Sequence, residues 1–177
     1  MILSKYLLVL LLPFTRIVPL TGAMATCGIN NSNNNKKCVP CEGLDASAIL
    51  PVEQVKLRLE SSLPLWTLQP LASDHTESKM MMMMISKSFV ARDFQCALDS
   101  LNAMGAIAER EGHHPDFHLT GYRNVRVDLF THSLGGITEN DLTVAELLDQ
   151  VPVSFSPKWL KENPQAAGQA KAHKAST

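Results

Sequence analysis

Four of the six histidines, His113, His114, His118 and His132, fall within twenty residues of a chain of otherwise ordinary composition. An imidazole titrates near neutral pH, so it can donate a proton in one step of a reaction and accept one in another. A single histidine on a loop or strand is more often a surface residue or a hydrogen-bonded one. The concentration of four therefore predicts a proton-transfer site in this part of the chain.

Zinc is the main alternative for these histidines, because imidazole is a common ligand of that metal. Histidine pairs that bind a metal on a helix usually stand four residues apart and face one way, whereas His113 and His114 are adjacent and diverge. Cys38 and Cys41 have the spacing of a zinc ligand pair, but no second cysteine pair or nearby histidine pair completes four donors. We favour a site without metal and keep zinc as the alternative.

A predicted helix places the first two histidines. Apolar residues recur at spacings of three and four, which is typical of an amphipathic helix from about Ala91 to Gly112; they are Phe94, Leu98, Leu101, Met104 and Ala108. Gly112 suits a C-terminal cap and Pro115 opposes continuation. We therefore expect His113 and His114 just past the helix end, where the negative end of the helix dipole favours a protonated imidazole and a general-acid role.

Strands are predicted on both sides of this helix. Residues 63–68 around Trp66 suggest a short strand, and residues 78–89 suggest an apolar one that contains five consecutive methionines, Met80 to Met84. We interpret the methionines as adaptable packing, with a copper-binding motif as the weaker alternative. Residues 122–132 alternate apolar and polar side chains, which predicts a strand with one buried face, and residues 117–119 can add one more.

The remaining elements complete the expected fold. Residues 51–59 can form a helix, and Thr138 opens a last helix as its N-cap, with Asp141 three residues on as in a capping box. The order of elements predicts an α+β fold, with an antiparallel, four-stranded sheet and about three helices packed on one face. The histidines should then lie where helix and strand ends meet.

The two ends of the chain differ in composition from its middle. Residues 1–25 combine an apolar run with a small-residue, cleavage-like sequence, so we expect a signal-like or targeting leader. A secretory signal peptide, an organelle-targeting leader and an upstream extension with translation starting at Met24 all stay open. Residues 26–43 are predicted to be a polar linker that contains Cys-Val-Pro-Cys, and residues 161–177 a disordered tail. The folded domain is expected over 44–160.

The charges exclude some classes of partner. Lysine and arginine total 16 against 17 acidic residues, for a net charge of −1, so there is no basic surface for nucleic acid. The apolar run near the N-terminus is too short for a comfortable membrane span, and we expect no membrane association of the folded domain.

The order of residues from Glu109 to Asp141 resembles a known family signature. An acidic residue, a gap of three, His113-His114-Pro115, the aromatic Tyr122, a later His132 and an Asp after a glycine-containing turn resemble the pterin-4a-carbinolamine dehydratases. The Cys-Val-Pro-Cys lead-in also looks like that of many members. Phe117 stands where a Trp is common, and the segment from Pro115 to Tyr122 looks one residue longer than in the animal proteins.

This resemblance implies an activity and a set of site residues. The implied reaction is dehydration of 4a-hydroxytetrahydrobiopterin to quinonoid dihydropterin, without metal or redox cofactor. His113, His114 and His132 are then the catalytic or substrate-contacting residues. Asp141 is either a carboxylate that supports a histidine or simply part of the helix N-terminus. Weaker candidates for the pterin site are Glu109, Pro115, Phe117 and Thr131, and His118 is expected to be a surface residue.

The resemblance also carries expectations about partners and location. It implies a pterin substrate, a homodimer or homotetramer, and a cytoplasmic or organellar location. The alternative function is a non-catalytic interaction module, because some members are dimerisation cofactors of a transcription factor in animals. Nothing in the sequence supports that partner.

Overall fold

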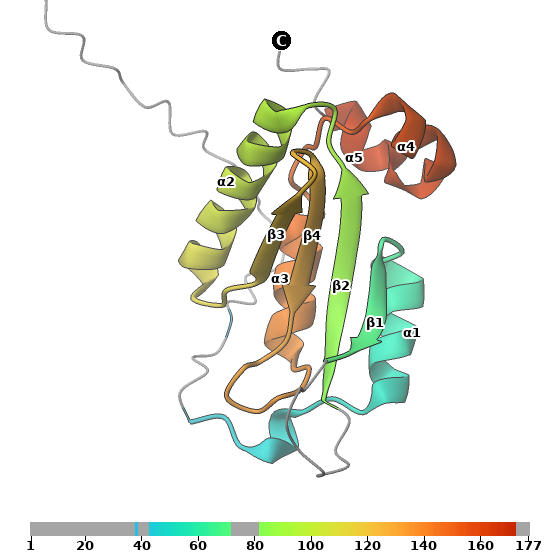
Figure 1. The fold of residues 1–177 in the computed structure, drawn as a ribbon. Helices are drawn as coiled ribbons and strands as arrows, with labels where there is room; N and C mark the ends of the chain where they lie inside the picture. The colour runs from blue at the N-terminus through green and yellow to red at the C-terminus, as the bar shows by residue number, and fades with distance from the viewer. Residues whose placement is uncertain (1–37, 39–42, 72–81, 173–177) are drawn as a thin grey trace, which may run out of the picture. The chain divides into compact units, whose positions relative to one another are not determined.

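The computed structural model describes residues 38, 43–71 and 82–172, and it contains one four-stranded antiparallel sheet in the order β1-β2-β4-β3 (Figure 1). The strands are β1 (Trp66–Pro70), β2 (Met83–Val90), β3 (Asp116–Thr120) and β4 (Asn124–Leu129). The predicted α+β class and the four strands are confirmed. The expected leader over 1–25, most of the linker over 26–43, and residues 78–81 of the methionine-containing strand lie outside the described residues.

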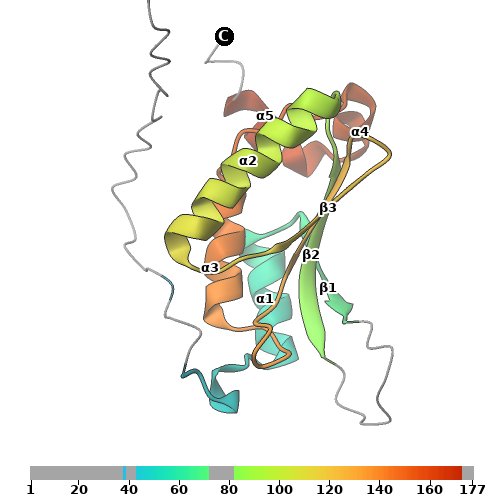
Figure 2. The same ribbon diagram turned by 60° about the vertical axis from the view of Figure 1, so that its left-hand side comes forward.

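Three helices cover one face of the sheet (Figure 2). They are α1 (Val52–Ser62), α2 (Phe94–Glu111) and α3 (Glu139–Leu148). Alternate residues of the strands point into this layer, and their side chains are buried: Ile85, Lys87 and Phe89 from β2, and Val125, Val127 and Leu129 from β4. The period-two pattern of the sequence therefore follows the pleat of the sheet, as predicted. No helix among the described residues is long and apolar enough to cross a membrane.

Helix α2 has the ends that the sequence predicts. The Asp93 carboxylate accepts the Cys96 backbone N–H at 2.8 Å, and this hydrogen bond holds the pKa of Asp93 at about 2. Gly112 ends the helix in the left-handed region, at φ 66°. The predicted buried stripe is partly wrong, because Phe94 in the first turn is exposed. The buried side shares Met104 and Ala108 with the prediction and also contains Cys96, Ala97, Ser100 and Ile107.

The C-terminal segment is ordered further than the sequence suggests. We expected disorder from residue 161, but α4 (Pro157–Glu162), a 3-10 turn (Pro164–Ala166) and α5 (Ala167–Ala172) follow one another. Residues 173–177 lie outside the described residues. Single side chains join this segment to the hydrophobic core: the fully buried Ala166, and the half-buried Trp159 just before residue 161.

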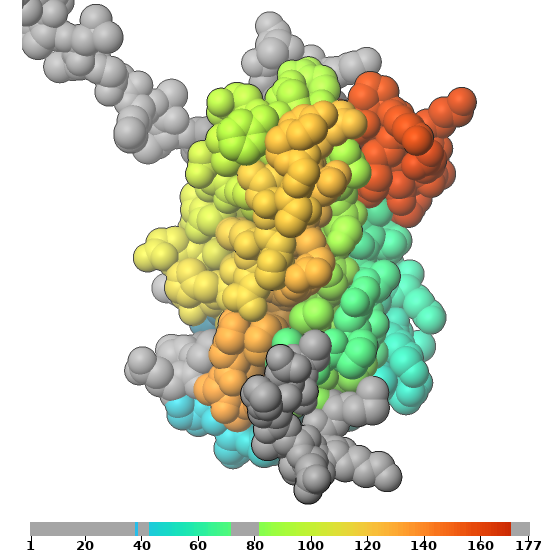
Figure 3. Space-filling model, viewed as in Figure 1, coloured from blue at the N-terminus to red at the C-terminus, as the bar shows by residue number. Residues whose placement is uncertain are grey.

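This segment covers the part of β2 that β1 does not reach. Strand β1 pairs with β2 only as far as Lys87. Beyond it, the Ser156 N–H donates to the Val90 carbonyl at 2.8 Å, and the Arg92 N–H donates to the Ser154 carbonyl at 2.8 Å. In the space-filling view the C-terminal residues lie against this end of the sheet (Figure 3). The segment therefore satisfies backbone groups at an otherwise open sheet edge.

Candidate active site

Four element ends meet at one end of the domain (Figure 1). There α2 ends and β3 begins, and β4 ends and α3 begins. His113 and His114 follow Gly112, His132 follows β4, and Asp141 lies in the first turn of α3. The local signals that stop α2 and start α3 therefore bring these residues to the same region.

His113 and Asp141 form a buried pair. The imidazole Nε2 lies 2.6 Å from Asp141 Oδ1, and the two side chains are 4% and 0% exposed. The second oxygen, Oδ2, accepts the Thr138 backbone N–H at 2.7 Å. One carboxylate thus contacts both the histidine and the helix N-terminus, so the two roles considered for Asp141 are not exclusive. An ionised carboxylate only accepts hydrogen bonds, so His113 Nε2 carries the shared proton.

Two hydroxyl groups complete the surroundings of Asp141. Thr131 Oγ1 lies 2.9 Å from Oδ2 and Thr138 Oγ1 lies 3.1 Å from it, and the two hydroxyl oxygens are 2.9 Å apart. Thr131 is almost completely buried. Its hydroxyl group is therefore part of an internal network beneath the site.

The other two histidines of the proposed site, His114 and His132, are exposed, and each has a carboxylate partner. His114 Nε2 lies 3.0 Å from Glu109 Oε2, and both side chains are open to solvent. His132, 58% exposed, has its Nε2 3.5 Å from Asp116 Oδ2, and its ring lies against Phe130 with the centroids 4.0 Å apart. Each of these imidazoles thus has a carboxylate oxygen as its nearest polar partner.

The contacts link His132 to the region of His113. Thr131, the residue before His132, contacts the same carboxylate as His113. Asp116, which pairs with His132, comes three residues after His113. The structure therefore brings the three expected histidines to one end of the molecule and does not place His132 on the far side.

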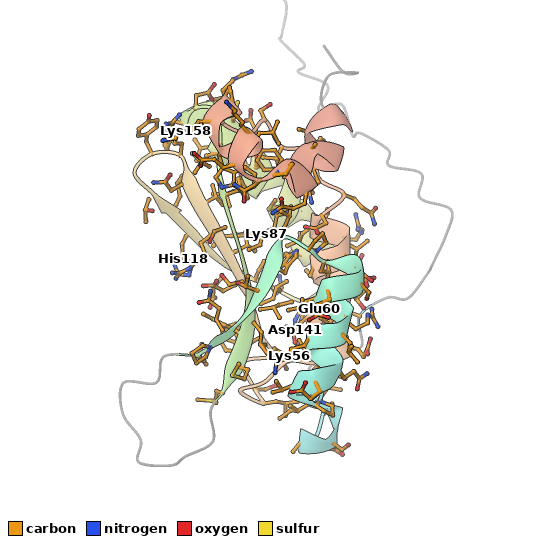
Figure 4. The ribbon with its side chains drawn as sticks, turned by 90° about the vertical axis from the view of Figure 1, so that its right-hand side faces the viewer. Lys56, Glu60, Lys87, His118, Asp141 and Lys158 are labelled. Atoms are coloured by element: carbon orange, nitrogen blue, oxygen red, sulfur yellow. The ribbon has the colours of Figure 1, made fainter. Side chains whose placement is uncertain are left out.

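The remaining candidates take different positions. Glu109 is exposed beside His114, and Pro115 is half-buried. Phe117 is half-buried in β3 opposite Val127 and packs on the hydrophobic core. His118 is on the opposite side of the sheet from Lys87 and Asp141 (Figure 4). It is partly exposed, with its Nε2 3.0 Å from the buried Asp128, so the expectation of a surface residue omitted this ion pair.

Sequence reasoning missed Asp116 and the hydroxyl group of Thr138. Asp116 meets His132 because β3 and β4 pair in one register, which the short β3 segment does not reveal. The sequence indicates Thr138 only as the N-cap of the last helix. Its position three residues before Asp141 was the available signal, since a capping threonine can also contact that carboxylate.

Neither of two hollows in the described structure is lined by the three histidines. One, of about 220 Å³, is apolar and lies beside the turn at 134–137 and α1. The other, of about 350 Å³, lies on the sheet face that contains His118. His114 and His132 are exposed, whereas His113 is buried. In the part of the chain that the structure describes, no three His, Cys, Asp or Glu side chains come together in a way that could hold a metal ion.

Comparison with known proteins gives a consistent result. Residues 48–151 match the model of a family described as pterin 4 alpha carbinolamine dehydratase. The chain is 44% identical over 111 residues to a putative pterin-4-alpha-carbinolamine dehydratase of Chlorobaculum tepidum, covering 63% of this chain and 89% of that protein. It is 35% identical over 133 residues to pterin-4-alpha-carbinolamine dehydratase 2, mitochondrial, of Arabidopsis thaliana, covering 75% of this chain and 65% of that protein.

Among solved structures, the chain is similar to a transcriptional coactivator/pterin dehydratase from Brucella melitensis, with 28% identity and a TM-score of 0.44 over 57% of this chain and 95% of that one. The matched family and relatives define the class of protein, a hydro-lyase that acts on a pterin. The chain belongs to the pterin-4a-carbinolamine dehydratase family, as the sequence predicted.

Proposed function

We propose that this chain removes water from 4a-hydroxytetrahydrobiopterin by histidine acid/base catalysis, giving quinonoid dihydropterin in the regeneration of tetrahydrobiopterin. Membership of the family supports the type of reaction. The observation that carries the histidine mechanism is the pairing of each expected histidine with a carboxylate: His113 with Asp141, His114 with Glu109, and His132 with Asp116. Each imidazole can change its protonation state beside a compensating charge.

The chemistry of the substrate explains why two proton-transfer groups are needed. Hydroxide is a poor leaving group, so an acid protonates the 4a oxygen while a base removes the proton from ring nitrogen N5. The proton given to oxygen leaves in water, and the base takes up the one from N5. The elimination is redox-neutral, so no electron donor or acceptor enters the balance.

Burial divides the three histidines into two kinds. His114 and His132 are exposed and are the groups we assign to proton exchange with the substrate. His113 is buried against Asp141 and is held in one orientation by its hydrogen bond. We assign it to the inner wall of the site, with Glu109 and Pro115 as further contacts to the pterin. Phe117 packs on the hydrophobic core and is assigned a structural role.

The test is turnover of chemically prepared 4a-hydroxytetrahydrobiopterin by the purified protein, followed by the absorbance change of the pterin. We expect acceleration over the uncatalysed reaction, and we expect His113→Ala to reduce kcat/KM by about 10³-fold and His132→Ala to reduce it by about 100-fold. His118→Gln is the matched control, since it removes a histidine on the other sheet face and should leave turnover within about twofold. A loss below about tenfold in both site variants would contradict the assigned roles.

We also propose an organellar location and self-association. The Arabidopsis relatives are named mitochondrial and chloroplastic, which supports a targeting role for residues 1–25. Sequencing the N-terminus of the native protein from isolated organelles tests this, and an intact N-terminus there would contradict it. A homodimer or homotetramer is proposed from the family, and sedimentation velocity of the purified protein tests it.

A further inference from the structure

We propose that Thr131 and Thr138 are positioning residues, whose paired hydroxyl groups fix the Asp141 carboxylate and, through it, the His113 imidazole. The inference deepens the proposed dehydration and rests on it. It changes the role of Thr131, which the sequence suggested as a substrate contact. It gives Thr138 a role beyond the start of α3.

Three polar groups surround one oxygen atom of Asp141. Asp141 Oδ2 is approached by the Thr138 N–H at 2.7 Å, the Thr131 hydroxyl at 2.9 Å and the Thr138 hydroxyl at 3.1 Å. Hydrogen bonds to an ionised carboxylate are among the stronger ones in proteins. Because these donors come from two separate segments, they restrict rotation of the carboxylate, and Oδ1 is left directed at His113 Nε2.

The hydroxyl groups of the two threonines also contact each other. The two threonine oxygens and Oδ2 form a triangle with three O···O contacts, two of 2.9 Å and one of 3.1 Å. Two hydroxyl groups supply only two protons. The shorter contacts fit Thr131 donating to Asp141 and Thr138 donating to Thr131. The Thr131 hydroxyl then accepts from Thr138 and donates to Asp141, so the two hydroxyl groups form one hydrogen-bonded chain that ends at the carboxylate.

The network around Asp141 is buried. Thr131, Thr138 and Asp141 are all almost completely inaccessible to solvent. A substrate bound at the exposed histidines cannot reach the Thr131 hydroxyl without displacing this packing. Any effect of Thr131 on the reaction therefore passes through Asp141.

The backbone of Thr131 connects this network to His132. The Thr131 N–H donates to the Gly136 carbonyl at 2.8 Å, and the Thr131 carbonyl accepts from the Leu134 and Gly135 N–H groups at 3.0 and 2.9 Å. Thr131 makes all three of these hydrogen bonds, and they close the turn that follows β4. Since the Thr131 side chain is bonded to Asp141, one residue fixes the start of the segment with His132 relative to His113.

The experiment compares Thr131→Val and Thr138→Val with Thr131→Ser and Thr138→Ser. The valines keep the volume and remove the hydroxyl group, whereas the serines restore it. Ser100→Ala is the matched control, because Ser100 is a buried hydroxyl on α2 that donates to the Cys96 carbonyl, away from Asp141. Each protein is checked for folding by its urea midpoint before kinetic measurement.

We expect each valine variant to lose about tenfold in kcat with KM changed less than twofold, as for an interaction that acts on the catalytic groups and not on substrate binding. The serine variants should recover to within about twofold, and Ser100→Ala should match the wild type. An increase in KM at constant kcat in Thr131→Val would overturn the inference, because it would make Thr131 a substrate contact.

A spectroscopic measurement tests the positioning without any turnover. In protein labelled with ¹⁵N-histidine, the proton on His113 Nε2 should give a slowly exchanging downfield resonance, assigned by its absence in His113→Gln. We expect it to shift or to exchange with solvent in both valine variants and to persist in the serine variants and Ser100→Ala. An unchanged resonance in both valine variants would refute the inference. A protein without dehydratase activity that shows the expected NMR changes would refute the proposed function and leave the positioning role standing.

Discussion

Helix α3 has a largely buried carboxylate at each end, and the two have different partners. Asp141, in its first turn, contacts an imidazole and two hydroxyl groups. Asp149, at the C-terminal end, accepts from Lys87 Nζ at 2.6 Å and from Trp66 Nε1 at 3.0 Å. The same side chain thus belongs to a proposed catalytic site at one end and to an ion pair at the other.

The helix itself explains why the partners differ. At the N-terminal end, free backbone N–H groups and the positive end of the dipole stabilise an ionised carboxylate, so Asp141 needs no cation. At the C-terminal end the dipole has the opposite sign and opposes a carboxylate. Asp149 therefore requires the Lys87 ammonium, which is only 1% exposed and also donates to Gln169 Oε1 at 3.2 Å.

The two ends consequently suit different tasks. The Asp141 carboxylate is stabilised by neutral donors, so a charge on His113 is not needed to hold the structure, and the pair is suited to orienting one wall of the proposed site. Lys87 and Asp149 depend on each other as charges, because neither is well solvated. We expect changes at Asp141 to affect mainly activity and changes at Asp149 to affect mainly stability.

The largest expected effect is on activity, from Asp141→Asn. The amide oxygen can replace Oδ2 and still accept from the threonines, but the amide nitrogen then faces His113 Nε2 as a donor. His113 must change tautomer to accept this bond, so its protonation pattern is inverted. We expect kcat to fall about 10³-fold, equivalent to about 4 kcal/mol of activation free energy, with a loss of unfolding free energy below about 1.5 kcal/mol. Steady-state kinetics and urea unfolding measure the two effects, and a variant that loses stability but keeps its kcat would show that Asp141 has a structural role like that of Asp149.

The next effect is on stability, from Asp149→Asn. This change leaves the Lys87 ammonium buried without its counter-charge, so we expect a loss of about 3 kcal/mol in unfolding free energy and turnover within about twofold of wild type. The double variant Lys87→Met/Asp149→Leu removes both charges and should recover most of that loss. Urea unfolding of the two variants decides the point. If the double variant is less stable than Asp149→Asn, packing and not charge pairing accounts for the role of Lys87.

Sequence patterns predicted the elements that have local signals. The three-and-four spacing before Gly112 located α2, and Thr138 with Asp141 located the start of α3, because caps and periodicity are properties of neighbouring residues. The position of His113 and His114 past the helix end followed from the same signals. The partner of each histidine mostly did not follow, since the Asp116 contact depends on the pairing of β3 with β4.

Lys87 shows a second limit of prediction from sequence patterns. Its position between Ile85 and Phe89 in β2 belongs to the buried face, but a lysine there does not indicate burial by its type. Its counter-charge lies 62 residues later in the chain, at Asp149. The helical segment after residue 160 was not predicted for a similar reason, because Trp159 and Ala166 belong to a core that is built from many separate parts of the chain.

A weaker effect is expected in the pH dependence of stability, which tests whether burial dominates the charge of Lys87. Burial lowers the pKa of Lys87 below its ordinary value of 10.5, and the attraction of Asp149 offsets this only in part. Below the folded-state pKa both states hold the proton, and the cost of burying the charge is fully present. Between the folded-state pKa and 10.5 the unfolded chain binds more protons than the folded one, so the unfolding free energy attributable to Lys87 rises with pH.

The measurement is the difference in unfolding free energy between the wild type and Lys87→Met/Asp149→Leu, from pH 7 to pH 10. Other groups that titrate in this range cancel in the difference, because both proteins contain them. We expect the wild type to gain on the double variant as the pH rises, by at most about 1.4 kcal/mol per pH unit, the limit for one proton. A difference that falls with pH would mean that the pair at the C-terminal end of α3 is dominated by attraction and not by desolvation. Lys87 would then resemble an ordinary surface ion pair, and the contrast with Asp141 would lose its electrostatic basis.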